Sequence, residues 1–147
     1  MLRKAVKIIL IIFLTVFLLL IAMIVLPLVI CPIIDNIALG RYESQILKEL
    51  DLPPDAEVIE IIHGCGNTGG TGNHTEMYVG MLIKTSLSAE EWEEYHYQVY
   101  STLTHGMETW AMGCVGLSFS EEYIAEGYYI LEFIESAPCS EFDLRGK

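Results

Sequence analysis

The sequence has few basic residues. Eight Lys and Arg stand against twenty Asp and Glu in a chain of 147 residues, which gives a formal net charge of -12 at pH 7. Arg3, Lys4 and Lys7 lie near the N-terminus, whereas every acidic residue follows residue 31. An acidic surface repels phosphate backbones and anionic lipids, and no stripe of Lys and Arg is present to bind them. The composition therefore argues against nucleic acid as a partner.

Charge is missing altogether from a long N-terminal segment. Residues 8–30 contain a single non-apolar residue, Thr15. As a helix this segment extends about 34 Å, which is enough to cross a bilayer. Because the basic residues lie on its N-terminal side, the positive-inside rule places the N-terminus in the cytoplasm and the C-terminus outside the cell. We expect a cytoplasmic basic tail over residues 1–7 and a single transmembrane helix over residues 8–31.

Two other interpretations of this segment lack their signals. A cleaved secretory signal has an apolar region of roughly 7 to 15 residues and a small-x-small cleavage site, and neither is present. A lipoprotein has a small residue before the acylated cysteine, but Cys31 follows Leu28-Val29-Ile30 and precedes Pro32. Pro27 and Pro32 instead mark a position where a membrane helix can end. We therefore expect an uncleaved signal-anchor in the plasma membrane.

A second helical pattern follows the apolar segment. Apolar side chains recur at helical spacing at Leu39, Tyr42, Ile46 and Leu50. This spacing predicts an amphipathic helix over residues 34–50 that packs on the globular domain. Arg41 and Lys48 are too few to hold such a helix on a membrane surface. We assign residues 32–54 to a juxtamembrane helix and linker.

Four β-strands are predicted in the remainder. Residues 57–63 and 128–135 are rich in β-branched and aromatic side chains, and apolar residues alternate along residues 75–85. Small and apolar residues favour a further strand over residues 111–119. The tail after residue 136 has no periodicity.

One helix is predicted between the second and third of these strands. Ser88-Ala89-Glu90-Glu91 is a capping box, in which Ser88 and Glu91 each satisfy the backbone amide of the other. Apolar residues then follow at helical spacing, and the pattern ends near Gly106. The residues of this face are Trp92, Tyr95, His96, Val99, Tyr100 and Leu103.

These elements define the predicted fold class. The domain over residues 55–136 is expected to be α+β, with an antiparallel sheet of about four strands in the order strand-strand-helix-strand-strand, packed with one or two helices. A doubly wound parallel fold needs repeated alternation of strands and helices, which is absent. Residues 137–147 form the C-terminal tail.

A glycine-rich segment joins the first two predicted strands, and we expect it to form a long hairpin loop with several positive-φ positions. Its start matches the G-x-G-x-x-G pattern of dinucleotide-binding folds, but no helix follows to receive a pyrophosphate. No Lys-Ser or Lys-Thr follows either, so no nucleotide is expected. The loop comprises Gly64, Cys65, Gly66, Asn67, Thr68, Gly69, Gly70, Thr71, Gly72, Asn73 and His74.

Several side chains near this loop could carry chemistry. His63, Cys65, His74 and Glu76 offer zinc-ligating atoms, and paired strands would bring His63 nearly opposite Glu76. Their spacing matches no common zinc pattern, so a specified turn with satisfied polar groups is the preferred interpretation, and no metal or other cofactor is predicted. Cys65 with a nearby histidine could also form a thiol nucleophile and base, although no third group orients them.

Cysteines outside the cell favour disulfides. Cys65, Cys114 and Cys139 are three in number, so one internal bridge at most can form. We expect Cys65 to pair with Cys114, and Cys114 with Cys139 is nearly as plausible.

The segment from Cys65 to His74, followed by a strand and by Leu87-Ser88-Ala89-Glu90-Glu91, resembles small uncharacterised membrane-anchored proteins of Gram-positive bacteria. The resemblance covers roughly residues 56–105 and implies a bacterial plasma membrane, but no activity and no functional residues. The sequence as a whole predicts a non-catalytic, membrane-tethered domain whose glycine-rich loop binds another membrane or cell-surface protein. A thiol enzyme at Cys65 and a His/Cys metal-binding module are the alternatives.

Overall fold

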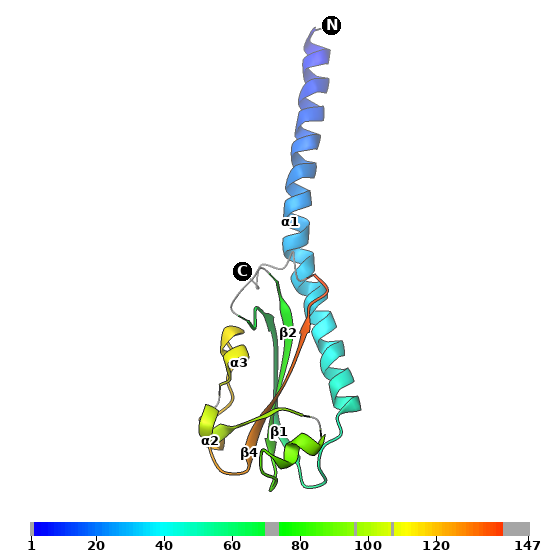
Figure 1. The fold of residues 1–147 in the computed structure, drawn as a ribbon. Coiled ribbons are helices and arrows are strands. Elements are labelled where there is room, and N and C mark those ends of the chain that lie inside the picture. Colours follow the sequence, from blue (N-terminus) through cyan, green and yellow to red (C-terminus); the bar gives the residue numbers. More distant parts are fainter. Residues whose placement is uncertain (1, 70–73, 96, 107, 140–147) are drawn as a thin grey trace.

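The computed structural model of the chain describes residues 2–69, 74–95, 97–106 and 108–139. The protein is α+β, with one long apolar N-terminal helix and a four-stranded antiparallel sheet, as the sequence predicts. Figure 1 shows three layers, with α1 on one side of the sheet and the short helices α2 and α3 on the other. The N-terminal half of α1 extends beyond the sheet as a separate rod.

The first helix, α1 (Leu2–Glu49), is continuous. Pro27 and Pro32 both lie inside it, so the expected end of the helix near these prolines is wrong. Proline removes one backbone hydrogen bond, but membrane helices tolerate it where neighbouring contacts compensate. Here the residues after Pro32 are held against the sheet, with Leu39 and Ile46 in the core. The helix ends at Glu49, within one residue of the end predicted for the amphipathic helix.

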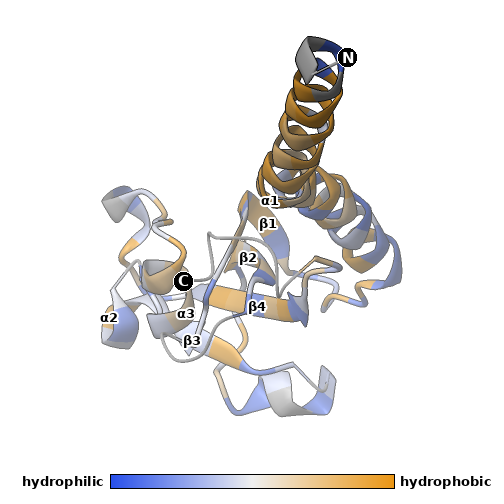
Figure 2. Ribbon diagram, turned by 90° about the horizontal axis from the view of Figure 1, so that it is seen from above, coloured by the Kyte–Doolittle hydropathy of each residue, from blue (hydrophilic) through white to orange (hydrophobic). Residues whose placement is uncertain are grey.

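The apolar half of α1 packs against nothing in the described chain. It forms a helix long and apolar enough to span a membrane, and the most apolar part is 0% buried. Large side chains such as Phe13 and Met23 are 68% and 74% exposed. Seen from above, the hydrophobic colouring of α1 gives way to a mixed surface where the helix meets the sheet (Figure 2). The helix is therefore compatible with a membrane anchor.

The sheet has the strand order β1-β2-β4-β3. Its central strands, β2 (Glu76–Lys84) and β4 (Tyr128–Ser136), pair along their whole length. The edge strand β1 (Glu57–Gly66) pairs with β2 through a register shift between Val58 and Glu60. The other edge, β3 (Val99–Ser101), covers only the first part of β4.

Each face of the sheet has its own hydrophobic core. Alternation along β2 sends Val79, Met81 and Ile83 toward α1, and Tyr78 and Leu82 toward the short helices. Because both faces are covered, β2 is buried almost throughout. The sheet thus acts as a rigid central layer that fixes α1 relative to the loops at its ends.

The long helix predicted after Ser88 is wrong. The capping box does form, since the Ser88 amide donates to Glu91 at 2.7 Å and the Glu91 amide donates to Ser88 Oγ at 3.4 Å. It starts only η1 (Glu91–Tyr95), a short 3-10 helix, and the chain then becomes β3. Val99 packs in the core on the α1 side and Tyr100 in the core on the other side, which is the alternation of a strand.

The strand predicted over residues 111–119 is also wrong, so the predicted order of elements is not the observed one. After α2 (Thr102–His105), this region forms α3 (Trp110–Cys114), whose first turn is capped by Thr109 Oγ1 accepting from the Met112 amide. A short 3-10 helix, η2 (Glu121–Tyr123), precedes β4. Met112 on α3 is fully buried against the sheet. The apolar residues that favoured a strand in the sequence therefore pack on the sheet from a helix.

Candidate functional site

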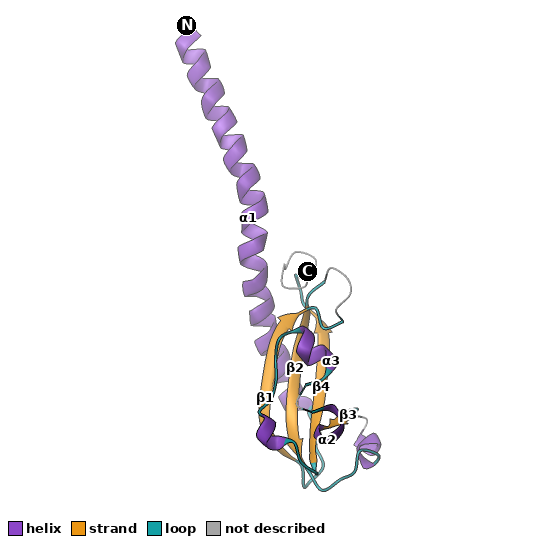
Figure 3. Cartoon of the chain, turned by 90° about the vertical axis from the view of Figure 1, so that its left-hand side faces the viewer, coloured by secondary structure: helices purple, strands orange, loops and turns teal. Residues whose placement is uncertain are grey.

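The described parts of the glycine-rich segment lie at the end of the sheet from which the apolar half of α1 projects (Figures 1 and 3). We call this end, formed by Gly66, Glu76 and the chain after Ser136, the anchor end. Gly64, Cys65 and Gly66 belong to β1 rather than to a loop. Asn67, Thr68 and Gly69 turn the chain, and His74 leads into β2. The other predicted loop residues, Gly70, Thr71, Gly72 and Asn73, lie outside the described residues.

Two of the glycines permit close packing rather than a positive φ. A Cβ on Gly66 would lie 2.9 Å from Cγ1 of Val115, and a Cβ on Gly64 would lie 3.2 Å from Cδ1 of Leu117. Neither glycine is among those with positive φ in the described chain, which are Gly106, Gly116 and Gly127. The glycines therefore let the segment after α3 lie directly on β1.

The base of the glycine-rich loop is held by Glu76. The Glu76 carboxylate accepts from the Thr68 amide at 3.2 Å and from the Thr68 hydroxyl, and it lies 3.3 Å from Nε2 of His74. Thr75 is fully buried, and its carbonyl accepts from the Ala137 amide at 3.0 Å. Both ends of the loop are thus fixed to the anchor end of the sheet.

The predicted metal ligands do not converge. The register pairs Glu76 with Gly66, so the expectation that His63 lies opposite Glu76 is wrong. His63 forms an ion pair with Glu43 of α1, and His74 with Glu76. In the part of the chain that the structure describes, no three His, Cys, Asp or Glu side chains are grouped to hold a metal.

A buried carboxylate that sequence reasoning missed occupies the anchor end. Asp35 of α1 is fully buried, and its Oδ1 accepts from the Cys139 amide at 2.9 Å. Its carbonyl oxygen lies 3.8 Å from Sγ of Cys65, and the buried Cys31 lies one helical turn earlier. The signal was present in the sequence, because Asp35 falls four residues before the buried Leu39 and on the same face of the helix.

Neither the expected disulfide between Cys65 and Cys114 nor the alternative between Cys114 and Cys139 is formed. Cys65 packs with the core on the α1 side, whereas Cys114 ends α3 on the opposite side of the sheet. Sγ of Cys65 lies near a backbone carbonyl oxygen, and His63 forms an ion pair with Glu43. These contacts do not bring the thiol and the imidazole together as nucleophile and base.

A second buried polar cluster lies under α3. Tyr78 donates to Oε1 of Glu132 at 2.8 Å, and the Thr109 hydroxyl donates to the same oxygen. Burial, the negative charge of Glu132 and this hydrogen bond raise the pKa of Tyr78 far above its usual value. Glu132 lies two residues after Ile130, so both side chains are on the face of β4 that α2 and α3 cover. A charged residue at a core-facing position of a strand was the sequence signal for this cluster.

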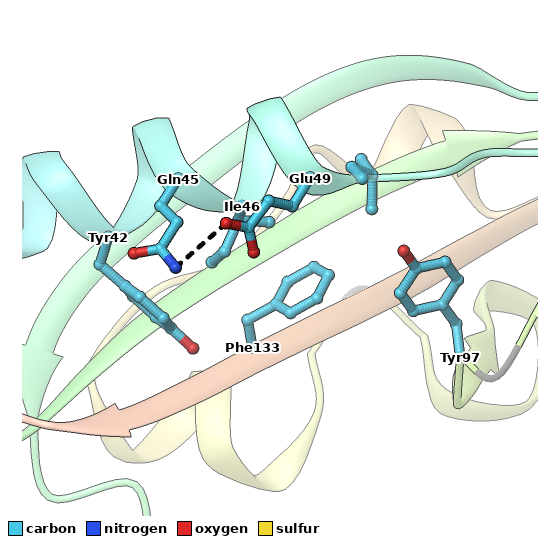
Figure 4. A pocket seen from close by; sticks show the side chains of 7 residues that line it. Tyr42, Gln45, Ile46, Glu49, Tyr97 and Phe133 are labelled. Atoms are coloured by element: carbon cyan, nitrogen blue, oxygen red, sulfur yellow. Dashed lines mark hydrogen bonds between the residues drawn. The ribbon is translucent and has the colours of Figure 1, made fainter.

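The third feature is a groove of about 310 Å³ between α1 and the sheet (Figure 4). We call it the α1–β4 groove. Its walls combine aromatic rings from three separate parts of the chain with polar side chains of α1. The lining residues are Tyr42, Gln45, Ile46, Glu49, Leu50, Tyr97 and Phe133.

Two of the rings in this groove are in contact. Those of Tyr97 and Phe133 meet edge to face with centroids 6.2 Å apart, and the Tyr97 hydroxyl accepts from the Asp51 amide at 3.2 Å. Burial, and to a smaller extent the negative charge of Glu135, raises the pKa of Tyr42. The groove therefore has aromatic walls in a negative surrounding.

Comparisons of the chain with known protein families, with curated proteins and with solved structures find no match.

Proposed function

We propose that the chain is a non-catalytic, membrane-tethered domain that presents its glycine-rich loop to another membrane or cell-surface protein. The N-terminus lies in the cytoplasm and the sheet domain outside a bacterial plasma membrane. The asymmetric charge supports this orientation, since Lys4 and Lys7 precede the apolar segment and the acidic residues follow it.

The observation that carries the proposal is the continuity of α1. The same helix exposes an apolar surface over its first half and packs on the sheet over its second half. A bilayer is the environment that removes such a surface from water. Because no linker separates the two halves, the domain would stand at a fixed height and angle on the membrane. The anchor end would face the outer leaflet.

The glycine-rich loop suits a recognition role at that position. Its base is held through Glu76 and Thr75, so the loop starts from a rigid platform. The sequence between Gly69 and His74 includes Gly70 and Gly72. Glycine has no side chain, so its backbone donors and acceptors are available for recognition. A partner protein in the same membrane would approach at this height.

The thiol-enzyme alternative has less support. Cys65 is partly buried beside α1, and its Sγ lies 3.8 Å from the backbone carbonyl oxygen of Asp35. Reactive cysteines lie in electropositive, accessible surroundings that lower the thiol pKa, and this domain is acidic. A measurement of alkylation rate against pH tests this alternative. Rapid alkylation of Cys65 at neutral pH, with a rate that falls only at more acidic pH, would favour the enzyme.

Site-specific photo-crosslinking in native membranes tests the proposal. A photoreactive amino acid is placed at His74, beside the loop, and at Glu57, at the opposite end of the sheet. The proposal expects a discrete protein adduct from position 74, its loss when Gly69 and Gly70 are both changed to alanine, and no such adduct from position 57. The same adduct from both positions, or an adduct indifferent to the glycine substitutions, contradicts a role for the loop.

A further inference from the structure

We propose that the α1–β4 groove binds the positively charged side chain of an Arg or Lys carried by a partner polypeptide. The inference names a second contact site, separate from the glycine-rich loop. It rests on the proposed function only in assuming a protein partner, because cation binding by the groove can be measured without one.

The aromatic walls supply the first part of the recognition. The ring of Phe133 lies between those of Tyr42 and Tyr97, as Figure 4 shows, and all three are only partly buried. Aromatic faces carry negative electrostatic potential and attract guanidinium and ammonium groups. Here three rings from separate parts of the chain leave an open groove between them, so their faces are accessible. In a well-packed core, other side chains would fill this space.

Carboxylates supply the second part. Glu49 lines the groove, and its carboxylate points toward Phe133 in Figure 4. Gln45 donates to Glu49 Oε1 at 3.3 Å, which orients the carboxylate at the rim. Glu135 follows Phe133 on the same face of β4 and acts electrostatically on Tyr42. A cation in the groove therefore meets the Glu49 carboxylate beside the aromatic wall and the negative charge of Glu135 acting near Tyr42.

The charges of the surroundings exclude other ligand classes. No Lys or Arg is among the groove's lining residues, and helical periodicity places Arg41 and Lys48 outside the face of α1 that carries Tyr42, Ile46 and Glu49. An anion would be repelled by the Glu49 carboxylate, and Glu135 adds to this negative field. A purely apolar ligand would displace water from the Glu49 carboxylate without supplying an opposite charge.

The shape of the groove favours a side chain over a free molecule. The cavity of about 310 Å³ is at the small end for a ligand pocket and opens along the side of α1. Gln45 and Glu49 at its edge are exposed. A side chain can enter while the rest of the partner contacts this exposed edge of α1.

The test uses the full-length protein in detergent micelles and follows the bound ligand by saturation-transfer NMR. The probe is N-acetyl-arginine amide, and its neutral isostere N-acetyl-citrulline amide is the control for shape. We expect the arginine derivative to bind with a dissociation constant in the millimolar range and the citrulline derivative to bind about tenfold more weakly. Equal binding of the two overturns the proposal.

Two pairs of variants locate the site. Glu49→Gln keeps an acceptor for Gln45 but removes the charge, and Glu57→Gln removes the same charge at an exposed residue that does not line the groove. Phe133→Leu removes a ring from the groove, and Phe119→Leu removes one from the opposite core. We expect the groove variants to weaken arginine binding about threefold to tenfold and the control variants to leave it unchanged.

Equal effects of the groove and control variants would assign the binding to overall charge and overturn the proposal. Tighter binding of tetramethylammonium than of the arginine derivative would also overturn it, in favour of a free quaternary ammonium ligand. If the groove variants abolish arginine binding while crosslinking through His74 fails, this inference stands and the proposed role of the loop falls. If crosslinking through His74 succeeds while the groove variants leave arginine binding unchanged, the proposed role of the loop stands and this inference falls.

Discussion

The amide of Cys139 donates a hydrogen bond of 2.9 Å to the carboxylate of Asp35, 104 residues earlier in the chain. Asp35 lies on α1 just after the apolar segment, and Cys139 follows the end of β4. The contact therefore joins the last described part of the chain to the helix that carries the apolar surface. It fixes the anchor end of the sheet to α1 at the point where the helix leaves the domain.

Replacing Asp35 with alanine should destabilise the domain. The substitution leaves the Cys139 amide without its acceptor and opens a small cavity, so we expect a loss of about 2 kcal/mol in the free energy of unfolding. Asp35→Asn keeps an acceptor oxygen and should lose about half as much. Chemical denaturation of the full-length protein in micelles measures both. Equal and negligible losses would show that the contact does not hold α1 to the sheet.

Stability should fall in alkaline solution through Tyr78. Burial and the neighbouring Glu132 charge raise the pKa of the folded Tyr78 hydroxyl above the 10.0 of an unperturbed tyrosine. The unfolded chain therefore loses this proton first, so the stabilisation is complete below pH 10.0 and declines as the pH rises above it. Tyr78→Phe should reduce this alkaline decline while costing about 1 kcal/mol at neutral pH.

Denaturation curves recorded at neutral and at alkaline pH, together with the ultraviolet absorbance of the phenolate, check this prediction. Tyr95→Phe is the matched control, because Tyr95 is only partly buried and packs with the core on the other side of the sheet. An alkaline decline that is the same in the protein and in the Tyr78→Phe variant would remove Tyr78 as its source.

Two glycine substitutions should change stability in opposite directions. A Cβ on Gly66 would lie 2.9 Å from Cγ1 of Val115, so Gly66→Ala should destabilise by about 1–3 kcal/mol. Gly40 lies inside α1 with nothing within 4 Å of its added Cβ, and Gly40→Ala should stabilise by about 0.5–1 kcal/mol. Thermal unfolding of the two variants in parallel measures both. Tolerance of alanine at position 66 would mean that the segment after α3 does not rest on β1.

The parts of the fold that the sequence predicts correctly are those with local signals. Strands β1 and β4 are rich in β-branched and aromatic residues, apolar residues alternate along β2, and α1 contains an apolar run far longer than a strand. The region after Ser88 has two compatible periodicities, helical in its apolar spacing and strand-like in Val99-Tyr100. One edge of β4 is not covered by β2, and residues 99–101 pair with it as β3. This tertiary contact decides in favour of the strand, and no local pattern contains it.

The candidate sites depend even more on distant contacts. Gly64 and Gly66 read as loop flexibility in the sequence, but their role is set by Val115 and Leu117 about fifty residues later. The α1–β4 groove is built from residues of α1, β4 and the segment before β3. Its rings appear in the sequence as ordinary core aromatics, and only the packing of α1 against the sheet leaves them open to a ligand.

The central claim is that α1 spans the membrane with the sheet domain outside. The native lysines test it directly, since Lys4 and Lys7 lie on one side of the apolar segment and Lys48 and Lys84 on the other, all with exposed side chains. Intact cells are treated with a membrane-impermeant amine reagent, and the modified lysines are identified by mass spectrometry before and after the membrane is opened. The account predicts labelling of Lys48 and Lys84 in intact cells and of Lys4 and Lys7 only after opening. Labelling of all four in intact cells, or of none until the cells are opened, would contradict it.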